Sequence, residues 1–191
     1  MTDEELKKND ERFIGMLRYL ARDRGENEND KQFRERRTAL ARLRKALKDG
    51  REAIDAYRHV VPFLPDDGKE HPEYFLVAGL FGFHPLLRDT GNMGSVFWEM
   101  AAREKGGSEG ANERRFLQLL NAHSEQLPFH LRRVVMMAKT GSSPVAIPYR
   151  LLLDDIRHWD HPRGYVQRRW AERYYRSFKE ASQSDGNTEK E

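Results

Sequence analysis

Apolar residues recur every three or four positions along most of this chain, and that spacing is the period of an amphipathic α-helix. Phe13, Leu17 and Leu20 show it near the N-terminus, and Val166 and Trp170 show it near the C-terminus. No segment alternates apolar and polar residues as a half-buried strand does. The sequence therefore predicts an all-α fold, a two-lobed helical bundle of about eight or nine helices.

Glycine, proline and polar runs divide the chain into segments with helical spacing. The expected helices span about 3–24, 31–48, 51–63, 71–84, 95–104, 111–122, 128–140, 148–159 and 162–180. Asp30 and Ser95 are candidate N-caps, because a short polar side chain can accept a hydrogen bond from a first-turn N–H. Segment 71–84 is apolar on nearly every side, which predicts a buried central helix.

A glycine-rich polar run at 105–110 predicts a flexible connection between two lobes. We therefore expect an N-terminal helical lobe over residues 1–110 and a C-terminal helical lobe over 111–181. The last residues, 182–191, are polar and offer no apolar anchors, so a disordered tail is expected there.

The chain has no cysteine, which excludes disulfides and thiolate metal sites and favours a reducing compartment. Its first ten residues are acidic and polar, unlike a signal peptide. No apolar run approaches the roughly 20 residues that cross a bilayer. We expect a soluble, cytoplasmic protein that needs no cofactor.

The formal net charge of +3 conceals two strongly basic blocks. Residues 31–58 hold 10 basic and 4 acidic side chains, and residues 130–179 hold 11 and 4. Between them, residues 59–129 hold 6 basic and 10 acidic side chains. Such segregation produces a local positive potential even where the total charge is small.

Helical wheels place much of this charge on defined helix faces. Segment 31–48 carries a basic edge opposite its leucines, formed by Arg34, Arg37, Lys45 and Lys48, with Arg44 at its border. The last helix carries a second basic stripe, formed by Arg169, Arg173 and Arg176, with Arg168 and Lys179 beside it. In segment 128–140, Arg132 is predicted to face outward and Arg133 to lie near the border of the inward face.

Arginine and lysine can simply solubilise the outer face of a helix, and one such stripe would mean little. Soluble helices usually balance a basic face with acids at i and i+4, and here only Glu35 and Glu172 do so. Two unbalanced stripes favour a polyanion, and nucleic acid fits better than a membrane because no apolar face remains for lipid. No base-reading motif is present, so the pattern indicates a surface that follows the phosphate backbone.

Residues 158–161 read His-Trp-Asp-His, and Asp154 and Asp155 lie shortly before them. These residues raise the possibility of a metal or acid–base site. The same spacing near a helix end also suits a C-cap, and adjacent helical carboxylates point about 100° apart. A surface or helix-end role is therefore expected for the two aspartates, and no catalytic set or metal site is assigned.

Several segments together resemble a known family. They are Ala41-Arg-Leu-Arg-Lys45, Tyr74-Phe-Leu-Val-Ala-Gly-Leu-Phe-Gly-Phe-His-Pro85, Asn112-Glu-Arg-Arg-Phe-Leu-Gln-Leu-Leu120, Leu127-Pro-Phe-His-Leu-Arg-Arg133, Trp159-Asp-His-Pro162 and Gln167-Arg-Arg-Trp-Ala171. In this order and spacing, over roughly residues 12–178, they are similar to CasB, the small subunit of the type I-E CRISPR Cascade complex.

The resemblance implies a non-catalytic, all-helical subunit. It would bind nucleic acid without sequence preference and stabilise the guide RNA–target DNA heteroduplex and the displaced strand, together called the R-loop. Its expected partners are the other Cascade subunits, guide RNA, both DNA strands and a second copy of itself packed head to tail. Together with the wheels it gives these candidate contacts: Arg34, Arg37, Arg44, Lys45, Lys48, Arg132, Arg133, Arg163, Arg168, Arg169, Arg173 and Arg176.

Two other classes of function stay open at the level of sequence. One is a small-molecule or metal-dependent enzyme that uses the scattered histidines and carboxylates. The other is a helical adaptor whose arginines meet acidic surfaces of partner proteins.

Overall fold

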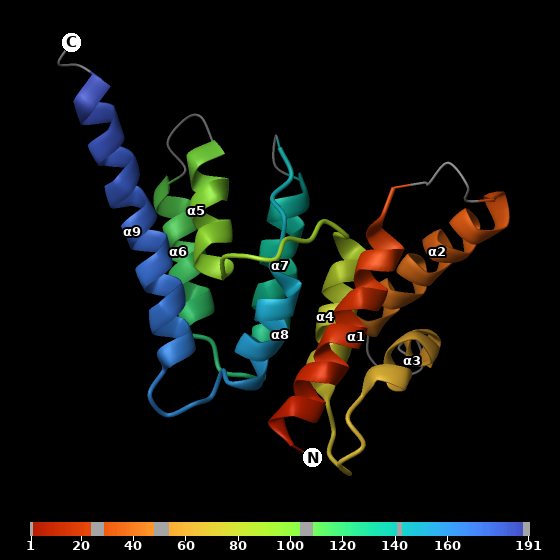
Figure 1. Ribbon diagram of the computed structural model, residues 1–191. Coiled ribbons are helices and arrows are strands. Elements are labelled where there is room, and N and C mark those ends of the chain that lie inside the picture. The colour runs from red at the N-terminus through yellow and green to blue at the C-terminus, as the bar shows by residue number, and fades with distance from the viewer. Residues whose placement is uncertain (1, 24–28, 48–53, 104–108, 141–142, 189–191) are drawn as a thin grey trace. The chain divides into compact units, whose positions relative to one another are not determined.

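The computed structural model describes residues 2–23, 29–47, 54–103, 109–140 and 143–188 (Figure 1). Over these residues it contains nine α-helices and two short 3-10 segments and no strand, so the predicted all-α class is confirmed. The chain folds as two compact units, Met1–Leu87 and Arg88–Glu191. No helix among the described residues is both long enough and apolar enough to cross a membrane.

Unit 1 is built around one apolar helix. Its elements are α1 (Asp3–Ala21), α2 (Asp30–Leu43), η1 (Arg44–Leu47), α3 (Ile54–Val60), η3 (Val61–Phe63) and α4 (Pro72–Phe83). Helix α4 packs against α2, η1 and α3, and Tyr74, Val77 and Phe81 have no exposed surface. Residues 71–84 therefore form the buried central helix that their composition predicts.

A close approach of backbones fixes how α4 meets α2. A Cβ atom on Gly82 would lie 2.7 Å from the backbone nitrogen of Arg44 and 2.9 Å from the carbonyl oxygen of Leu40. Only glycine leaves room for this contact. Helix α2 begins at Asp30, one residue before the expected start at Lys31. Its N-cap is Asn29 and not Asp30, because the Asn29 Oδ1 accepts a hydrogen bond from the N–H of Gln32 at 2.9 Å.

Unit 2 contains α5 (Met93–Arg103), α6 (Glu109–Leu120), α7 (Leu127–Thr140), α8 (Tyr149–Arg157) and α9 (Tyr165–Thr188). Helix α5 packs most extensively against α9 and also contacts α6 and α7 (Figure 1). The ring of Phe116 lies 4.9 Å from Phe97 and 4.5 Å from Tyr174, centroid to centroid. These aromatic contacts join α5, α6 and α9 in one core.

This packing differs from the lobe boundary expected at residue 110. Because α5 contributes Phe97 to a core with α6 and α9, the division falls at Leu87 and Arg88, before α5. The end of the chain also differs from the expectation, since α9 runs to Thr188 where a tail was predicted from residue 182.

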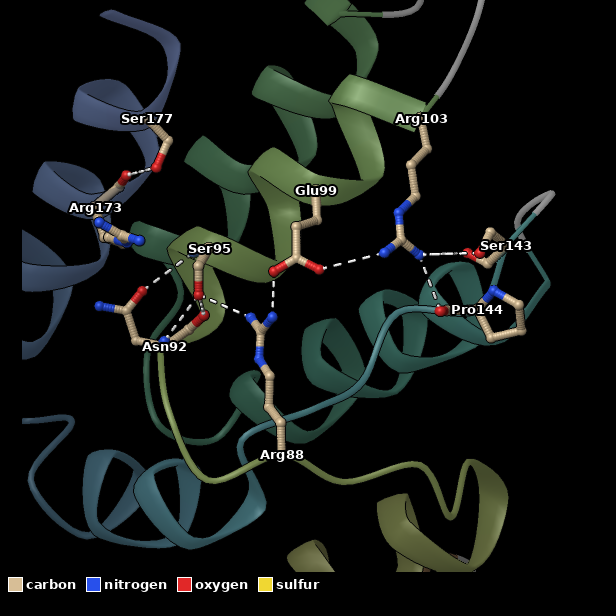
Figure 2. Close-up of polar contacts among 9 residues, drawn as sticks. All are labelled: Arg88, Asn92, Ser95, Glu99, Arg103, Ser143, Pro144, Arg173 and Ser177. Atoms are coloured by element: carbon tan, nitrogen blue, oxygen red, sulfur yellow. Dashed lines mark hydrogen bonds and ion pairs between the residues drawn. The ribbon is translucent and has the colours of Figure 1, made fainter. Parts of the chain in front are cut away.

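A network of polar contacts fixes the start of α5 (Figure 2). Asn92 is the N-cap: its Oδ1 accepts from the N–H of Ser95 at 3.2 Å, while the Ser95 Oγ accepts from the N–H of Asn92 at 3.0 Å. Ser95 was expected to be the cap but occupies the third helical position of this reciprocal arrangement. Arg88 donates a hydrogen bond to Ser95 Oγ at 2.8 Å and forms an ion pair with Glu99. Glu99 also pairs with Arg103, whose Nη2 lies 3.6 Å from its Oε2.

Candidate nucleic-acid interface

A basic hollow lies between α2 and α3 in unit 1. Its volume is about 820 Å³, and it is lined by Asp30, Lys31, Arg34, Glu35, Thr38, Arg42, Arg58 and His59. Four of these side chains are permanent cations and two are acidic, so the hollow is net positive. An open surface of this kind can accept phosphate oxygens without reading bases.

His59 is the one histidine among the residues that line this hollow. Burial, together with the charges of Arg58 and Arg42, lowers the pKa of its imidazole. Its Nε2 is buried and has no hydrogen-bond partner within the described part of the chain. The positive potential of the hollow at neutral pH therefore comes from its arginines and lysine.

Only part of the predicted α2 edge is available for a ligand. Arg34 and Arg37 are exposed, and Arg34 lines the hollow. Arg44 donates from Nε to the carbonyl oxygen of Gly82 at 2.5 Å, and Lys45 forms an ion pair with Asp55. Arg44 and Lys45 are exposed, but these two contacts tie them to other groups of unit 1, and Lys48 lies outside the described residues.

Arg36 has a role that the sequence does not reveal. It lies in the middle of the first basic block but is only 4% exposed. Its Nη1 donates to the carbonyl oxygens of Leu20 at 3.2 Å and Arg22 at 2.7 Å. Those carbonyls belong to the end of α1, where four C=O groups lack helical partners. Arg36 therefore caps α1 and is not a contact candidate.

The sequence also misses three basic residues that line the hollow. Lys31 and Arg42 lie on α2 outside the predicted edge, and Arg58 comes from α3. A wheel treats one helix at a time and cannot show that α3 lies beside α2. The excess of basic residues over positions 31–58 was the only signal available for Arg58.

On α7 the two predicted arginines are both exposed. The guanidinium of Arg133 lies over the ring of Phe129, 5.5 Å from its centroid, which is a cation–π contact. Leu131, Val134, Val135 and Ala138 face the core as expected. Arg132 and Arg133 thus belong to the outer face of α7.

On α9 the predicted stripe is exposed, but its members differ in what they contact. Arg168 and Arg176 each lie 3.9 Å from a carboxylate oxygen of Glu172. Arg169 forms an ion pair with Asp155 on α8. Arg173 is exposed, and so is Arg163 in the segment that precedes the helix. The arginines of the last basic block therefore do not form one uniform surface.

Asp155 is buried, so the prediction that it is a surface or helix-end charge is wrong. It is 1% exposed and accepts a hydrogen bond from the indole N–H of Trp170 at 2.6 Å. Burial raises the pKa of its carboxyl group, although the bonds from Trp170 and Arg169 oppose that shift. The carboxylate joins α8 to α9 and is part of the fold.

The His-Trp-Asp-His segment serves packing and capping. His158 is the C-cap of α8, and its Nδ1 lies 2.9 Å from the carbonyl oxygen of Asp154. Trp159 is 2% exposed and donates to the carbonyl oxygen of Ala122 at 2.8 Å. Among the residues that the structure describes, no group of three or more His, Cys, Asp or Glu could hold a metal.

These observations define a class: an all-helical protein of two units, with arginine-rich exposed faces and a basic hollow. Within that class, the chain belongs to the CRISPR-associated Cse2 family, whose family model matches residues 39–175. The resemblance to CasB noted in the sequence is thereby confirmed, since solved CasB chains are among the similar structures.

A CRISPR-associated Cse2 protein of Thermus thermophilus is 34% identical over 123 residues, which cover 63% of this chain and 68% of that protein. A crystal structure of a Cse2-family protein from the same organism superposes with a TM-score of 0.66 at 28% identity, covering 87% of this chain and 97% of that chain. A chain of a CRISPR RNA-guided surveillance complex superposes with a TM-score of 0.68. It is 21% identical and covers 94% of this chain and 99% of that chain, so this likeness shows the fold alone.

Proposed function

We propose that this chain is the non-catalytic small subunit of a type I-E CRISPR Cascade complex. In this role it binds nucleic acid without sequence preference and stabilises the guide RNA–target heteroduplex and the displaced strand. The observation that carries the proposal is the basic hollow between α2 and α3 in a chain of the Cse2 family. A surface of arginine and lysine suits a ligand whose every residue carries a phosphate.

The contacts of each cation decide which residues we assign to phosphate. Arg34 and Arg37 on α2, together with Arg42 and Arg58 of the hollow, form the first group. The second group is Arg132 and Arg133 on α7, and the third is Arg163, Arg168, Arg173 and Arg176. We assign Arg44, Lys45 and Arg169 to the fold, because each bonds to a residue of another element. Arg168 and Arg176 stay in the third group, because Glu172, with which they pair, lies on their own helix.

A role without catalysis is supported by what the candidate catalytic groups do in the fold. His158 caps α8, and the ring of His161 packs against Tyr165 at 4.8 Å. Asp155 accepts a hydrogen bond from Trp170 and forms an ion pair with Arg169. The enzyme hypothesis therefore has no assigned catalytic residue, and the family match favours a complex subunit.

The proposed partners are the other Cascade subunits, guide RNA, the target and displaced DNA strands, and a second copy of this chain. Assembly in the cytoplasm follows from this set. An adaptor that binds only proteins is the competing assignment, and it predicts arginine faces covered by acidic protein surfaces. Nucleic acid is favoured because the hollow is open and its cations come from two helices.

The experiment is co-purification. The tagged full chain is expressed with the remaining Cascade proteins and a repeat array, and the native mass of the product is measured. Recovery of a guide-RNA complex that contains two copies of the chain supports the proposal. A monomer without RNA, from cells that make the complex, contradicts it.

A further inference from the structure

The outer face of α7 exposes two large apolar side chains. Phe129 is 60% exposed and Met136 is 47% exposed. They lie seven positions apart, which is about two helical turns, so both are on one face about 10 Å apart along the axis. A single exposed apolar residue is ordinary, but two large ones on one helix face form an apolar patch that is a candidate contact surface.

Positive charge surrounds these apolar groups. Arg132 and Arg133 lie on α7 between them, and both are exposed. Over the whole helix, Leu127–Thr140, the sequence contains Arg132, Arg133 and Lys139 and no aspartate or glutamate. The face therefore combines apolar and cationic groups without a balancing acid on its own helix.

The neighbouring helix adds to the charge. A shallow hollow between α6 and α7 is lined by Arg115 from α6 and by His130 and Arg133 from α7. Arg115 is held by a hydrogen bond from Nη1 to Asn112 Oδ1 at 3.2 Å and remains exposed. A protein partner for this face would have to be acidic, whereas a nucleic-acid strand carries its negative charge at every residue.

The ring of Phe129 is also oriented by its neighbours. The Arg133 guanidinium lies over it, 5.5 Å from its centroid, and the His130 ring lies 5.4 Å away, centroid to centroid, at an interplanar angle of 82°. An oriented ring loses less conformational freedom when a planar ligand stacks on it. Aromatic side chains beside arginine are the usual platform for unpaired bases, because every base has a π-face.

We propose that the outer face of α7 binds single-stranded nucleic acid by base stacking, with an unpaired base on Phe129. Arg132 and Arg133 bind the flanking phosphates, and Met136 contacts a neighbouring base. This inference rests on the proposed function, and it adds where an unpaired strand is held and by which interaction, base stacking on Phe129. Duplex is bound less well at this face, because its bases are already stacked inside the helix.

The test measures the affinity of the full chain, at low salt, for a single-stranded oligothymidine and for an oligomer of equal length that consists of abasic residues. Phe129→Ala is expected to weaken binding to the oligothymidine about 5-fold or more, since the ring supplies the stacking. It is expected to leave binding to the abasic oligomer unchanged. Phe129→Tyr, which keeps the ring, is the matched control and should bind like the natural chain.

The salt dependence separates stacking from charge. Phe129→Ala should leave the slope of log affinity against log salt unchanged, whereas Arg132→Ala should reduce it by about 0.7 for one lost phosphate. If the natural chain binds both oligomers equally and Phe129→Ala changes neither, stacking is overturned while backbone binding stands. If the natural chain binds neither oligomer at low salt, both the stacking site and the proposed function are contradicted. Unchanged DNA binding with a loss of the chain from the assembled complex would identify the face as a protein interface and also overturn the proposal.

Discussion

The guanidinium of Arg169 forms an ion pair with the carboxylate of Asp155, a residue that is 1% exposed. Arg169 lies on the exposed basic stripe of α9, yet its partner is buried between α8 and α9 and also accepts from Trp170. An arginine in a stripe can therefore stabilise the fold, and mutating it to test binding would disturb both properties.

Arg169→Ala is expected to lower the free energy of unfolding by about 1–2 kcal/mol, because it leaves a buried carboxylate with one partner fewer. Arg173→Ala, one turn along the same stripe, should change it by no more than about 0.5 kcal/mol. Urea unfolding of both variants measures the difference. Equal stabilities would mean that the Arg169–Asp155 pair contributes nothing to the fold.

Gly94 lies where α5 meets α9. A Cβ atom at this position would be 2.0 Å from the carbonyl oxygen of Trp170, so Gly94→Ala must displace one helix. We expect a loss of about 1–3 kcal/mol in the free energy of unfolding. Gly15→Ala is the control. Nothing lies within 4 Å of a Cβ atom at this exposed position on α1, so the variant should gain about 0.4–1 kcal/mol. Thermal unfolding of the two variants should shift in opposite directions.

Arg36 and Arg37 are adjacent in sequence, but we expect only Arg36 to contribute to the stability of the fold. Arg36→Ala removes the hydrogen bonds to Leu20 and Arg22 at the end of α1 and should cost about 2–3 kcal/mol of stability. Arg37→Ala, at an exposed position, should retain stability within about 0.5 kcal/mol. Chemical unfolding of the pair tests this, and a destabilised Arg37→Ala would contradict the assignment.

The stability of unit 1 should depend on pH through His71. Burial opposes its protonation, but hydrogen bonds with Asp67 at 2.9 Å and Glu73 at 3.2 Å outweigh burial and raise its pKa. A raised pKa means that the stabilising contribution is complete below the unfolded-state value of about 6.5. It is lost as pH rises through the folded-state value.

His71→Gln is therefore expected to lose more stability, relative to the natural chain, at pH 6 than at pH 8. Comparing the two proteins at each pH removes the opposite effect of His59, whose lowered pKa favours the fold at higher pH. Unfolding free energies at the two pH values provide the measurement. A difference that does not change with pH would show that His71 is not charged in the fold.

The features that could be predicted from the sequence are those set by the residue spacing within a single helix. The spacing of Val166, Trp170 and Tyr174 placed these residues in the core, and the composition of 71–84 predicted a buried helix, because both follow from the 3.6-residue period. The exposure of Arg34 and Arg37 on the basic edge follows from the same argument.

What the sequence could not show depends on contacts between helices that are distant along the chain. The pairing of Lys45 with Asp55, the burial of Asp155 and the contribution of Arg58 to the hollow all need a second helix in place. The position of the division at Leu87 and Arg88 likewise follows from the packing of α5 on α9, some 70 residues apart in sequence.

The most direct test of the central claim is the salt dependence of single-stranded DNA binding by the natural chain and by a variant of the hollow, Arg34→Ala, Arg42→Ala and Arg58→Ala combined. The slope of log affinity against log salt should flatten by about 2, because each lost phosphate contact contributes about 0.7. A double variant of Lys7→Ala and Lys8→Ala, two exposed α1 residues that do not line the hollow, should keep the natural slope. If the hollow variant retains both the affinity and the slope of the natural chain, the hollow does not bind nucleic acid and the account is contradicted.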